Sequence, residues 1–470
     1  MCGIVGYIGP RKAYDILIKG LLCLEYRGYD SAGIALEKDD GGMCVYKAKG
    51  KVTNLEAGCM GKDVRGSLGI AHTRWATHGE PNDRNAHPQL SQSGALALVH
   101  NGTIENYAVL KEALSRHGYT FVSDTDTEVL VQLIEYVKTT NGCDLVSAVR
   151  EALKQVIGAY AIAVIEKDNP DMMVIARKSS PLVIGIGEGE TFIASDATPI
   201  VGFTDKVIYL NDDEIAVIGR NKKLQILSIA GNKPSKVDIQ TLKLSVEQLE
   251  KGGYETFMLK EIFEQPDTLR DCIRGRITDD GKNVILSGVI ENREKFMTAH
   301  RIIIVACGTS WHAALIGKRL IQEMCRLPVE VEYASEFRYG FPFITDKDIV
   351  IAISQSGETA DTLAGLRLAK EQGVKTLGIV NVVGSSIARE ADNVFYTMAG
   401  PEISVATTKA YSAQLIAGYL LAIEFARVRE KITKEQYDAL LTEMQTLPEK
   451  INKIIEDKER IQLLSLIHIS

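Results

Sequence analysis

The sequence predicts two successive folds: a layered α+β domain with antiparallel sheets, followed by an α/β domain with a parallel sheet. Short apolar strands bounded by glycine and polar turns fill the first 240 or so residues, without strict alternation with helices. After residue 300, fully apolar strands alternate with helices, which is typical of a parallel sheet covered on both faces. A polar, lysine-rich stretch between Gly219 and Gly253 separates the patterns, so we place the domain boundary near 245.

The spacing of apolar residues predicts the individual elements. In the first domain, helical spacing is found at 108–116 and at 127–140. In the second domain, a helix is expected from about 311 to 326, after the first strand. Strands are expected at 3–8, 31–36, 68–73, 95–100, 159–165, 173–176 and 215–218, and then at 301–306, 348–353 and 376–381.

Length and charge limit the possible functions. The chain has 470 residues, a net charge of −7 and a pI near 5.8. This length predicts two or three domains, and the acidic balance argues against a nucleic-acid-binding surface. No apolar run approaches the roughly 20 residues that span a bilayer, and the N-terminus does not resemble a signal peptide. We therefore expect a cytoplasmic protein without nucleic-acid or membrane partners.

The cysteines predict no metal site, but one of them is unusual. The eight cysteines form no C-x-x-C pair, and the histidines do not cluster near them at zinc-site spacing. Cys2 follows the initiator methionine and is small enough for Met1 to be removed. Its free α-amine, with an ordinary pKa of about 7.7–8.0, would then lie beside its own thiol and could act as the base for it.

Four polar blocks follow Cys2, at 25–33, 72–81, 100–106 and 123–128. In this order after Met-Cys-Gly they resemble the class II glutamine amidotransferases with the N-terminal-nucleophile hydrolase fold. The resemblance is closest to the fructose-6-phosphate aminotransferases and covers nearly all of residues 1–463. It implies that Cys2 is the nucleophile and that the Asn101 side chain and the Gly102 backbone N–H form the oxyanion hole.

The same resemblance implies how glutamine is held. Free glutamine carries a carboxylate and an ammonium, so its site needs one cation and one anion at a fixed separation. Arg74 is the expected partner of the carboxylate, and Asp126 accepts from the ammonium. In the family, the loop 74–81 closes over glutamine. The implied roles in it are glutamine contacts from Thr77 and His78 and a gate to the ammonia channel at Trp75.

Each of these residues alone has a simpler interpretation. Arg74 and Asp126 could be partners in surface ion pairs, and Trp75 could be a core residue. His78 could be a hydrogen-bonded loop histidine, and Asn101-Gly102 is typical of a hairpin turn. The joint occurrence of these residues with a cysteine at position 2 favours the glutaminase interpretation.

Two strand-to-helix turns, at 307–310 and 354–359, predict a phosphate site. Hydroxyls and free backbone N–H groups at the carboxyl ends of parallel strands suit a phosphate dianion, whereas helix capping is the simpler alternative. With the segments 257–266 and 399–409, these turns resemble the sugar-isomerase (SIS) fold of the same family. The fructose 6-phosphate ligands that this resemblance implies are Ser310, Ser354, Gln355, Ser356, Thr359 and Val405.

The resemblance also implies the domain organisation. We expect a class II glutamine amidotransferase domain at 1–245 and a linker with the first SIS subdomain at 250–463. Residues 464–470 resemble a translated sequencing adapter, so we expect a non-native tail and a missing second SIS subdomain. The base, the histidine and the lysine of the isomerisation belong to that second subdomain.

The implied reaction converts fructose 6-phosphate and L-glutamine into glucosamine 6-phosphate and glutamate, without metal or organic cofactor. The present chain would hydrolyse glutamine and bind the sugar phosphate, and the full-length protein would be a homodimer. A non-catalytic sugar-phosphate-sensing SIS protein is an alternative, but it would not need Cys2, Arg74 and Asp126 together. An amidotransferase for another sugar phosphate is a further alternative.

Overall fold

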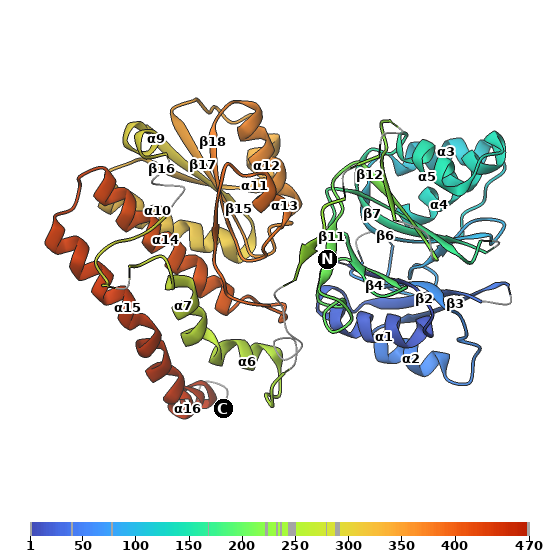
Figure 1. Ribbon diagram of the computed structural model, residues 1–470, viewed down its shortest axis with the longest axis horizontal. Coiled ribbons are helices and arrows are strands. Elements are labelled where there is room, and N and C mark those ends of the chain that lie inside the picture. The colour runs from blue at the N-terminus through green and yellow to red at the C-terminus, as the bar shows by residue number, and fades with distance from the viewer. Residues whose placement is uncertain are drawn as a thin grey trace. The chain divides into compact units, whose positions relative to one another are not determined.

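The computed structural model describes residues 2–38, 41–76, 79–167, 169–220, 224–231, 234–235, 237–242, 251–278, 280–286 and 292–467. These residues form two compact units, unit 1 (Met1–Val246) and unit 2 (Glu247–Ser470) (Figure 1). Each unit has its own sheets and buried cores. Within the described part of the chain, no helix combines the length and the apolar character that crossing a membrane requires.

Unit 1 contains two sheets in which all neighbouring strands that the structure describes are antiparallel. The larger sheet has eight strands, in the order β14 (Gln240–Thr241), β11 (Lys206–Tyr209), β9 (Val183–Ile186), β10 (Thr191–Ala194), β1 (Gly3–Ile8), β4 (Leu68–Arg74), β2 (Ser31–Glu37) and β3 (Met43–Lys49). The smaller sheet has six, in the order β13 (Gln225–Ser228), β12 (Glu214–Gly219), β8 (Met172–Lys178), β7 (Gly158–Glu166), β6 (Leu96–Ile104) and β5 (Gln89–Leu90).

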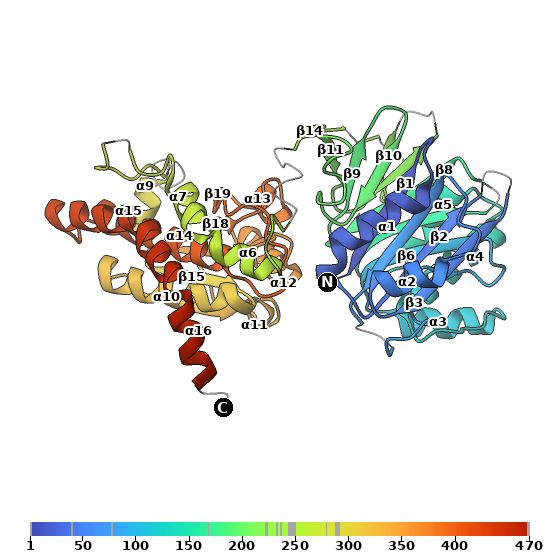
Figure 2. The ribbon, with the colours of Figure 1, turned by 90° about the horizontal axis from the view of Figure 1, so that it is seen from below.

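The two sheets pack face to face, and helices cover their outer faces (Figures 1 and 2). Strand β1 shows why: Ile4 and Ile8 join the core between the sheets, whereas Val5 and Tyr7 join the core under the helices. Unit 1 is therefore a four-layer sandwich, which confirms the predicted antiparallel α+β fold. The covering helices are α1 (Ala13–Leu24) and α2 (Val52–Cys59) on the larger sheet, and α3 (Tyr107–Arg116), α4 (Asp126–Asn141) and α5 (Leu145–Leu153) on the smaller one.

Helix α4 begins and ends where capping chemistry allows. The Thr125 hydroxyl accepts the Glu128 backbone N–H at the start, and Gly142 ends the helix in the left-handed conformation. The predicted helices 108–116 and 127–140 correspond to α3 and α4. A short 3-10 turn, η1 (Glu25–Arg27), follows α1.

Unit 2 is built on a parallel sheet covered on both faces, as predicted. Along β15, Ile302 and Ile304 face one core, whereas Ile303 and Val305 face the other. The strand order is β16 (Val329–Tyr333), β15 (Arg301–Ala306), β17 (Asp348–Ser354), β18 (Lys375–Val380) and β19 (Asn393–Tyr396). One face packs α7 (Gln265–Ile273), α10 (Gly308–Cys325), α14 (Lys409–Val428) and α15 (Lys434–Glu456); the other packs α11 (Ala334–Tyr339), α12 (Ala360–Glu371) and α13 (Ser386–Glu390).

Three further helices of unit 2 are α6 (Phe257–Phe263), α9 (Arg293–Thr298) and α16 (Lys458–Ile467). Helix α16 ends at Ile467.

The strand order in unit 2 reverses direction between β15 and β17. The chain leaves β15 through α10 toward β16, and it leaves β17 through α12 toward β18 on the opposite side. These helices lie on opposite faces of the sheet, so the carboxyl ends of β15 and β17 flank a topological switch point. Open α/β sheets bind their ligands at such a point.

The backbone around His87 packs tightly on the larger sheet at Gly33. A β-carbon at this position of β2 would collide with the His87 carbonyl oxygen, a backbone atom that cannot rotate away. We expect Gly33→Ala to lower the unfolding free energy of unit 1 by about 1–3 kcal/mol, as overpacking does. Urea unfolding followed by Trp75 fluorescence in a Trp311→Phe background reports on unit 1, because the chain has only these two tryptophans.

Gly58→Ala is the matched control, because a β-carbon at this position of α2 meets open space. Alanine is the better helix former, so its stability should stay the same or rise. Equal unfolding curves for Gly33→Ala and Gly58→Ala would contradict the packing argument.

Candidate functional site

The pairing of β1 with β4 brings the predicted nucleophile to the predicted carboxylate-binding segment. Gly3 lies opposite Thr73 in this pairing, so Cys2 lies next to the end of β4, where Arg74 and Trp75 follow. The Trp75 backbone N–H donates to Cys2 Sγ over 3.2 Å, and the thiol faces the Trp75 carbonyl at 3.4 Å. Strand register alone thus joins residues more than seventy positions apart.

The environment of Cys2 keeps its sulfur protonated near neutral pH. Burial raises the pKa of the Cys2 thiol, and the Trp75 N–H and the Arg74 and Arg27 charges only partly offset this effect. Attack on an amide therefore requires a base that takes the thiol proton.

Two donors hold the main chain of residue 2. The Arg27 Nε and the Asn101 Nδ2 donate to the Cys2 carbonyl oxygen over 3.2 and 3.0 Å. Arg27 is itself fixed by an ion pair with Asp196, with 2.8 Å between Nη1 and Oδ2. The main chain of the nucleophile is thereby held by side chains from η1 and from β6.

The Asn101 amide is oriented by a buried polar network. Its Nδ2 also donates to the Ser195 Oγ over 2.8 Å, and its Oδ1 lies 2.9 Å from His72 Nε2. The same Nε2 lies 3.0 Å from the His100 carbonyl oxygen, so it faces two acceptors and must carry the proton. Burial lowers the pKa of His72 to about 3, so the ring is neutral at physiological pH.

This network has a consequence for the predicted oxyanion hole. Both hydrogens of the Asn101 amide are engaged, one by the Cys2 carbonyl and one by Ser195. Donation to an oxyanion therefore requires release of one of these bonds.

Gly102 lies within β6, not in a hairpin turn, so the simpler interpretation of Asn101-Gly102 is wrong. Its φ of +133° is open to glycine, and a β-carbon would collide with the Ala159 carbonyl oxygen of the neighbouring strand. A side chain is excluded at this position, whatever the role of its N–H.

Arg74 and Asp126 are buried, with 4% and 6% of their surface exposed, so the interpretation as surface ion-pair partners is wrong. Burial lowers the pKa of Arg74, while the nearby Cys2, Asp126 and Asp30 raise it. Asp126 is the first residue of α4, and its Oδ2 accepts the Ile104 backbone N–H over 2.9 Å. Arg74 thus lies within electrostatic reach of both Asp126 and the Cys2 thiol.

Trp75 is not a core residue: it is 40% exposed and packs edge-on against Tyr29, with 5.7 Å between the ring centroids. The predicted glutamine contacts Thr77 and His78 lie outside the described residues.

In unit 2, the predicted phosphate ligands lie at the switch point. Ala306 and Ile353 are partners at the ends of β15 and β17. The two turns predicted to bind phosphate, 307–310 and 354–359, follow them directly. Ser310, in the first turn of α10, accepts from Gln414 Nε2 over 3.0 Å. The two turns therefore reach the same edge of the sheet from its two faces.

The hydroxyls of the second turn also stabilise the turn itself. Ser354 Oγ accepts the Gly357 backbone N–H over 2.9 Å and lies 2.9 Å from Thr359 Oγ1. Ser356 Oγ accepts the Glu358 N–H over 3.2 Å. Thr359 precedes α12 without a side-chain cap bond, so simple helix capping does not explain it.

The segment 399–409 is fixed by carboxylates that the sequence did not single out. Val405 is 63% exposed, and the preceding N–H groups of Ile403 and Ser404 donate to Glu261 Oε1 over 2.6 and 2.9 Å. Glu402 accepts two N–H groups at the start of α14, and burial raises its pKa to about 7. Glu261 lies in the predicted segment 257–266, but nothing local indicated this contact.

The sequence also did not indicate the roles of His72, Ser195, Arg27 and Asp196. His72 is the first residue of the block 72–81, and Arg27 lies in the block 25–33. Their positions could therefore have marked them as site residues, but not what they contact. Ser195 and Asp196 follow β10 and lie in none of the four blocks.

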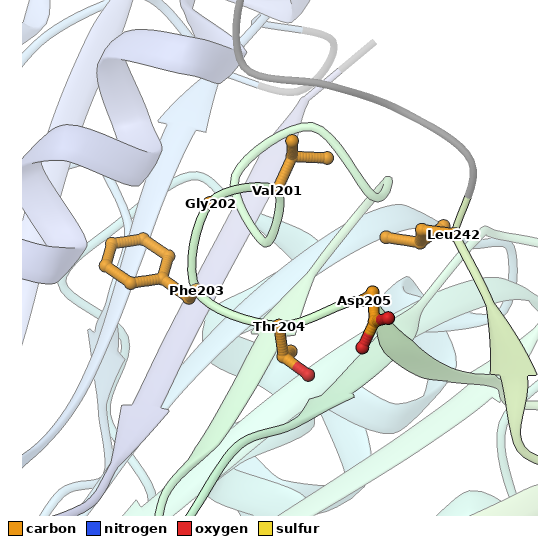
Figure 3. Close-up of a pocket in the computed structure, with 6 residues that line it drawn as sticks. All are labelled: Val201, Gly202, Phe203, Thr204, Asp205 and Leu242. Carbon is orange, nitrogen blue, oxygen red and sulfur yellow. The ribbon is translucent and has the colours of Figure 1, made fainter.

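A pocket in unit 1 lies elsewhere. It is lined by Val201, Gly202, Phe203, Thr204, Asp205 and Leu242 (Figure 3). None of the predicted site residues lines it. Across the described residues, no group of three or more potential metal ligands comes together.

Two family models match the chain: a glutamine amidotransferase domain at 72–201 and a SIS domain at 295–424. A glutamine–fructose-6-phosphate aminotransferase (isomerizing) of Bacteroides thetaiotaomicron is 58% identical over 99% of this chain and 76% of its own length. The enzyme of the same name from Chlorobaculum tepidum is 52% identical, again over 99% of this chain and 76% of its own.

Among solved structures, the C-terminal domain of the glucosamine-fructose-6-phosphate aminotransferase from Francisella tularensis matches with 37% identity. The match spans 46% of this chain and 60% of the Francisella chain, with a TM-score of 0.44. The sequence identity and coverage of the two full-length relatives decide the assignment: the chain belongs to the family of isomerizing glutamine–fructose-6-phosphate aminotransferases.

Proposed function

We propose that unit 1 hydrolyses the side-chain amide of glutamine and that unit 2 binds fructose 6-phosphate, the acceptor of the released ammonia. The product of the complete reaction is glucosamine 6-phosphate. The observation that carries the proposal is the convergence of the Cys2 thiol, the Asn101 amide and the buried charges of Arg74 and Asp126 at one end of β1 and β4. The names of the relatives support the two substrates.

In this proposal, glutamine hydrolysis begins at the Cys2 thiol. With Met1 removed, the α-amine of Cys2 takes the thiol proton, and the sulfur attacks the side-chain carbonyl carbon of glutamine. Asn101 Nδ2, after it releases the Cys2 carbonyl or Ser195, stabilises the oxyanion together with the Gly102 N–H. The amine then returns the proton to the leaving nitrogen. Ammonia leaves, and water then cleaves the thioester to release glutamate and restore the thiol.

Arg74 and Asp126 select the substrate in this proposal. Arg74 pairs with the α-carboxylate of glutamine and Asp126 with the α-ammonium. In unit 2, Ser310, Ser354, Gln355, Ser356 and Thr359 hold the phosphate end of the sugar, with Val405 nearby. We assign the proton transfers of the isomerisation to no residue of this chain.

We also propose that the full-length protein is a cytoplasmic homodimer without nucleic-acid or membrane partners, and that residues 1–245 and 250–463 are its amidotransferase domain and first SIS subdomain. The family resemblance and the acidic net charge of −7 support this view.

Replacement of Cys2 by alanine should abolish glutamate release from glutamine, because the chain then lacks the nucleophile. A coupled glutamate assay, with and without fructose 6-phosphate, measures the release, and intact mass reports whether Met1 has been removed. Cys23→Ala, a partly buried thiol in α1, should retain the wild-type rate. Failure of a folded, Met1-processed wild-type chain to release glutamate would overturn the glutaminase assignment.

Replacement of Asp126 by asparagine should raise the KM for glutamine by roughly 10- to 100-fold, the range expected for a lost hydrogen bond to a charged group. The kcat should change less, because the interaction of Asp126 with the α-ammonium stabilises the bound substrate as well as the transition state. Asp144→Asn is the matched control: Asp144 also begins a helix, where it caps Ser147 N–H, but lies at α5. Equal KM values for both variants would refute the role of Asp126.

Replacement of Ser356 by alanine should weaken fructose 6-phosphate binding about tenfold, since one charge-assisted hydrogen bond to the phosphate is lost. Isothermal titration calorimetry measures the Kd, with Thr442→Ala on α15 as the control, where the hydroxyl bonds only its own helix. An unchanged Kd for Ser356→Ala would show that this turn serves the fold alone.

A further inference from the structure

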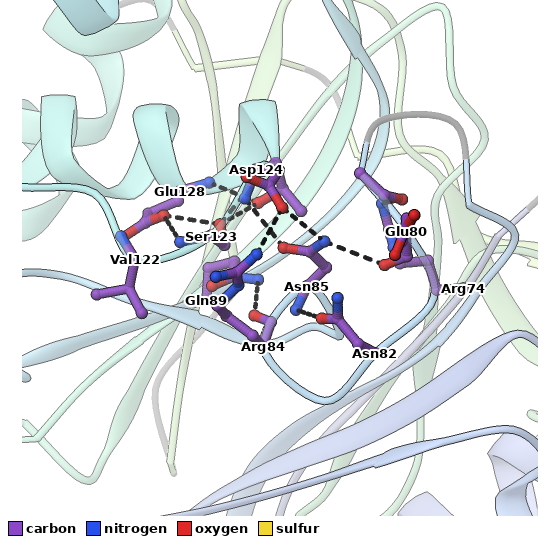
Figure 4. Close-up of polar contacts among 12 residues, drawn as sticks. Arg74, Glu80, Asn82, Arg84, Asn85, Gln89, Val122, Ser123, Asp124 and Glu128 are labelled. Carbon is purple, nitrogen blue, oxygen red and sulfur yellow. Dashed lines mark hydrogen bonds and ion pairs between the residues drawn. The ribbon is translucent and has the colours of Figure 1, made fainter.

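Asn85 is fully buried although it lies in an irregular segment between Gly79 and β5. Its own backbone N–H donates to Asn82 Oδ1 over 2.8 Å, which fixes the turn around it. A buried amide normally satisfies its donors and acceptor within the protein, so its partners show what it connects. Figure 4 shows these partners around the Asn85 side chain.

One end of the Asn85 amide holds the segment that follows Arg74. Its Nδ2 donates to the Glu80 carbonyl oxygen over 3.0 Å. The neighbouring carbonyl oxygen, that of Gly79, lies 3.4 Å from Arg74 Nη2. Asn85 therefore holds the peptide group next to the one that the Arg74 guanidinium contacts.

The Asn85 amide also holds the segment that leads into α4. Asn85 Oδ1 accepts the Asp124 backbone N–H over 2.9 Å, and Nδ2 also donates to Asp124 Oδ2 over 3.1 Å. This bond, with Arg84, keeps the pKa of the Asp124 carboxyl below its usual range. Asp124 stands only two residues before Asp126.

The segment from Val122 to Glu128 behaves as one hydrogen-bonded piece. Glu128 accepts the backbone N–H groups of Val122 and Ser123 over 2.8 and 2.6 Å, and Thr125 caps the helix by accepting the Glu128 N–H. A displacement of Asp124 would therefore move the start of α4, and with it the Asp126 side chain.

Gly79 permits the close approach of the two segments. Its φ is +77°, and a β-carbon there would lie 2.6 Å from Asn85 Nδ2 and 2.9 Å from Asp124 Cβ. The segment after Arg74 and the segment before Asp126 are therefore packed directly against the Asn85 amide.

We propose that Asn85 is a positioning residue that sets the separation between Arg74 and Asp126, and so makes the site specific for a free α-amino acid. The inference rests on the proposed function, since it takes these two residues as the partners of the α-carboxylate and the α-ammonium. One bridging side chain keeps the cation and the anion at the distance at which a single carbon atom can carry both groups.

The decisive variant is Asn85→Asp, which has almost the same shape and keeps the acceptor for Asp124 N–H. It replaces the donor by an oxygen that faces the Glu80 carbonyl and the Asp124 carboxylate, so the two segments should separate. Asp124→Asn in the same chain returns one donor to this contact and should restore part of the affinity.

Asn106→Asp is the matched control. The Asn106 amide also joins two segments, since it donates to the Gln155 carbonyl over 2.9 Å and accepts the Ile157 N–H over 3.0 Å. Among the described residues it bonds neither Arg74 nor Asp126, so its variant reports the cost of the same amide-to-acid change at a partly exposed bridge outside the site.

The experiment measures the Kd of glutamine by calorimetry in the Cys2→Ala background, where nothing is turned over, and the kcat and KM of glutaminase in the Cys2 chain. We expect Asn85→Asp to weaken binding and raise KM at least about tenfold, as for one lost buried hydrogen bond. The kcat should stay within about twofold of Asn106→Asp. So should the rate of Cys2 alkylation by iodoacetamide, a reagent that carries neither an α-carboxylate nor an α-ammonium.

The outcomes are distinguishable. Weaker glutamine binding in Asn85→Asp with partial rescue by Asp124→Asn supports the proposal, even if the Cys2 chain releases no glutamate and the glutaminase assignment fails. An unchanged Kd overturns the proposal, as does equal weakening in Asn106→Asp or a parallel loss of kcat, iodoacetamide reactivity and thermal stability. The absence of glutamine binding to Cys2→Ala overturns both proposals.

Discussion

The register between β1 and β4 is the constraint on which unit 1 depends. Because Gly3 stands opposite Thr73, the residue before the first strand must meet the residues that end the fourth. No flexible arm is needed to bring the thiol to Arg74, and a shift by one residue would turn every side chain of β1 to the other face. Such a shift would place Ile4 and Ile8 under the helices and Val5 and Tyr7 between the sheets, so the cores on both faces enforce the position of the site.

A second constraint is that the site is built from buried polar groups. Asn101, His72 and Ser195 are each at most 6% exposed, and each bonds another member of the same network. A neutral histidine suits this location, because a charged ring between the two sheets would lack the water that stabilises it. The cost of leaving any one of these groups without its partner keeps the arrangement rigid before a substrate arrives.

Much of the fold could be predicted from local patterns, whereas the site could be predicted only in part. Strand alternation and the apolar runs of β15, β17 and β18 are local properties, and most predicted ranges agree with the structure within a residue or two. The exceptions are β6, which extends four residues beyond the predicted 95–100, and α10, which begins three residues before the predicted start near 311. The burial of Arg74 and Asp126 was not a local property: their charges suggested surface partners, but strand pairing and the start of α4 place them inside. The contact of Ser195 with Asn101 joins residues 94 positions apart, and the contact of Glu261 with Ile403 joins residues 142 positions apart. Spacing in the sequence does not encode contacts over such separations.

The glycine at 102 limits how this sequence can change over time. Its β-carbon has no room beside the Ala159 carbonyl, and its φ lies outside the range that other residues adopt readily. Every single-base change of a glycine codon that alters the amino acid introduces a residue with a β-carbon or a stop. No single-base change at this codon therefore gives a residue that fits, and only silent changes are tolerated there.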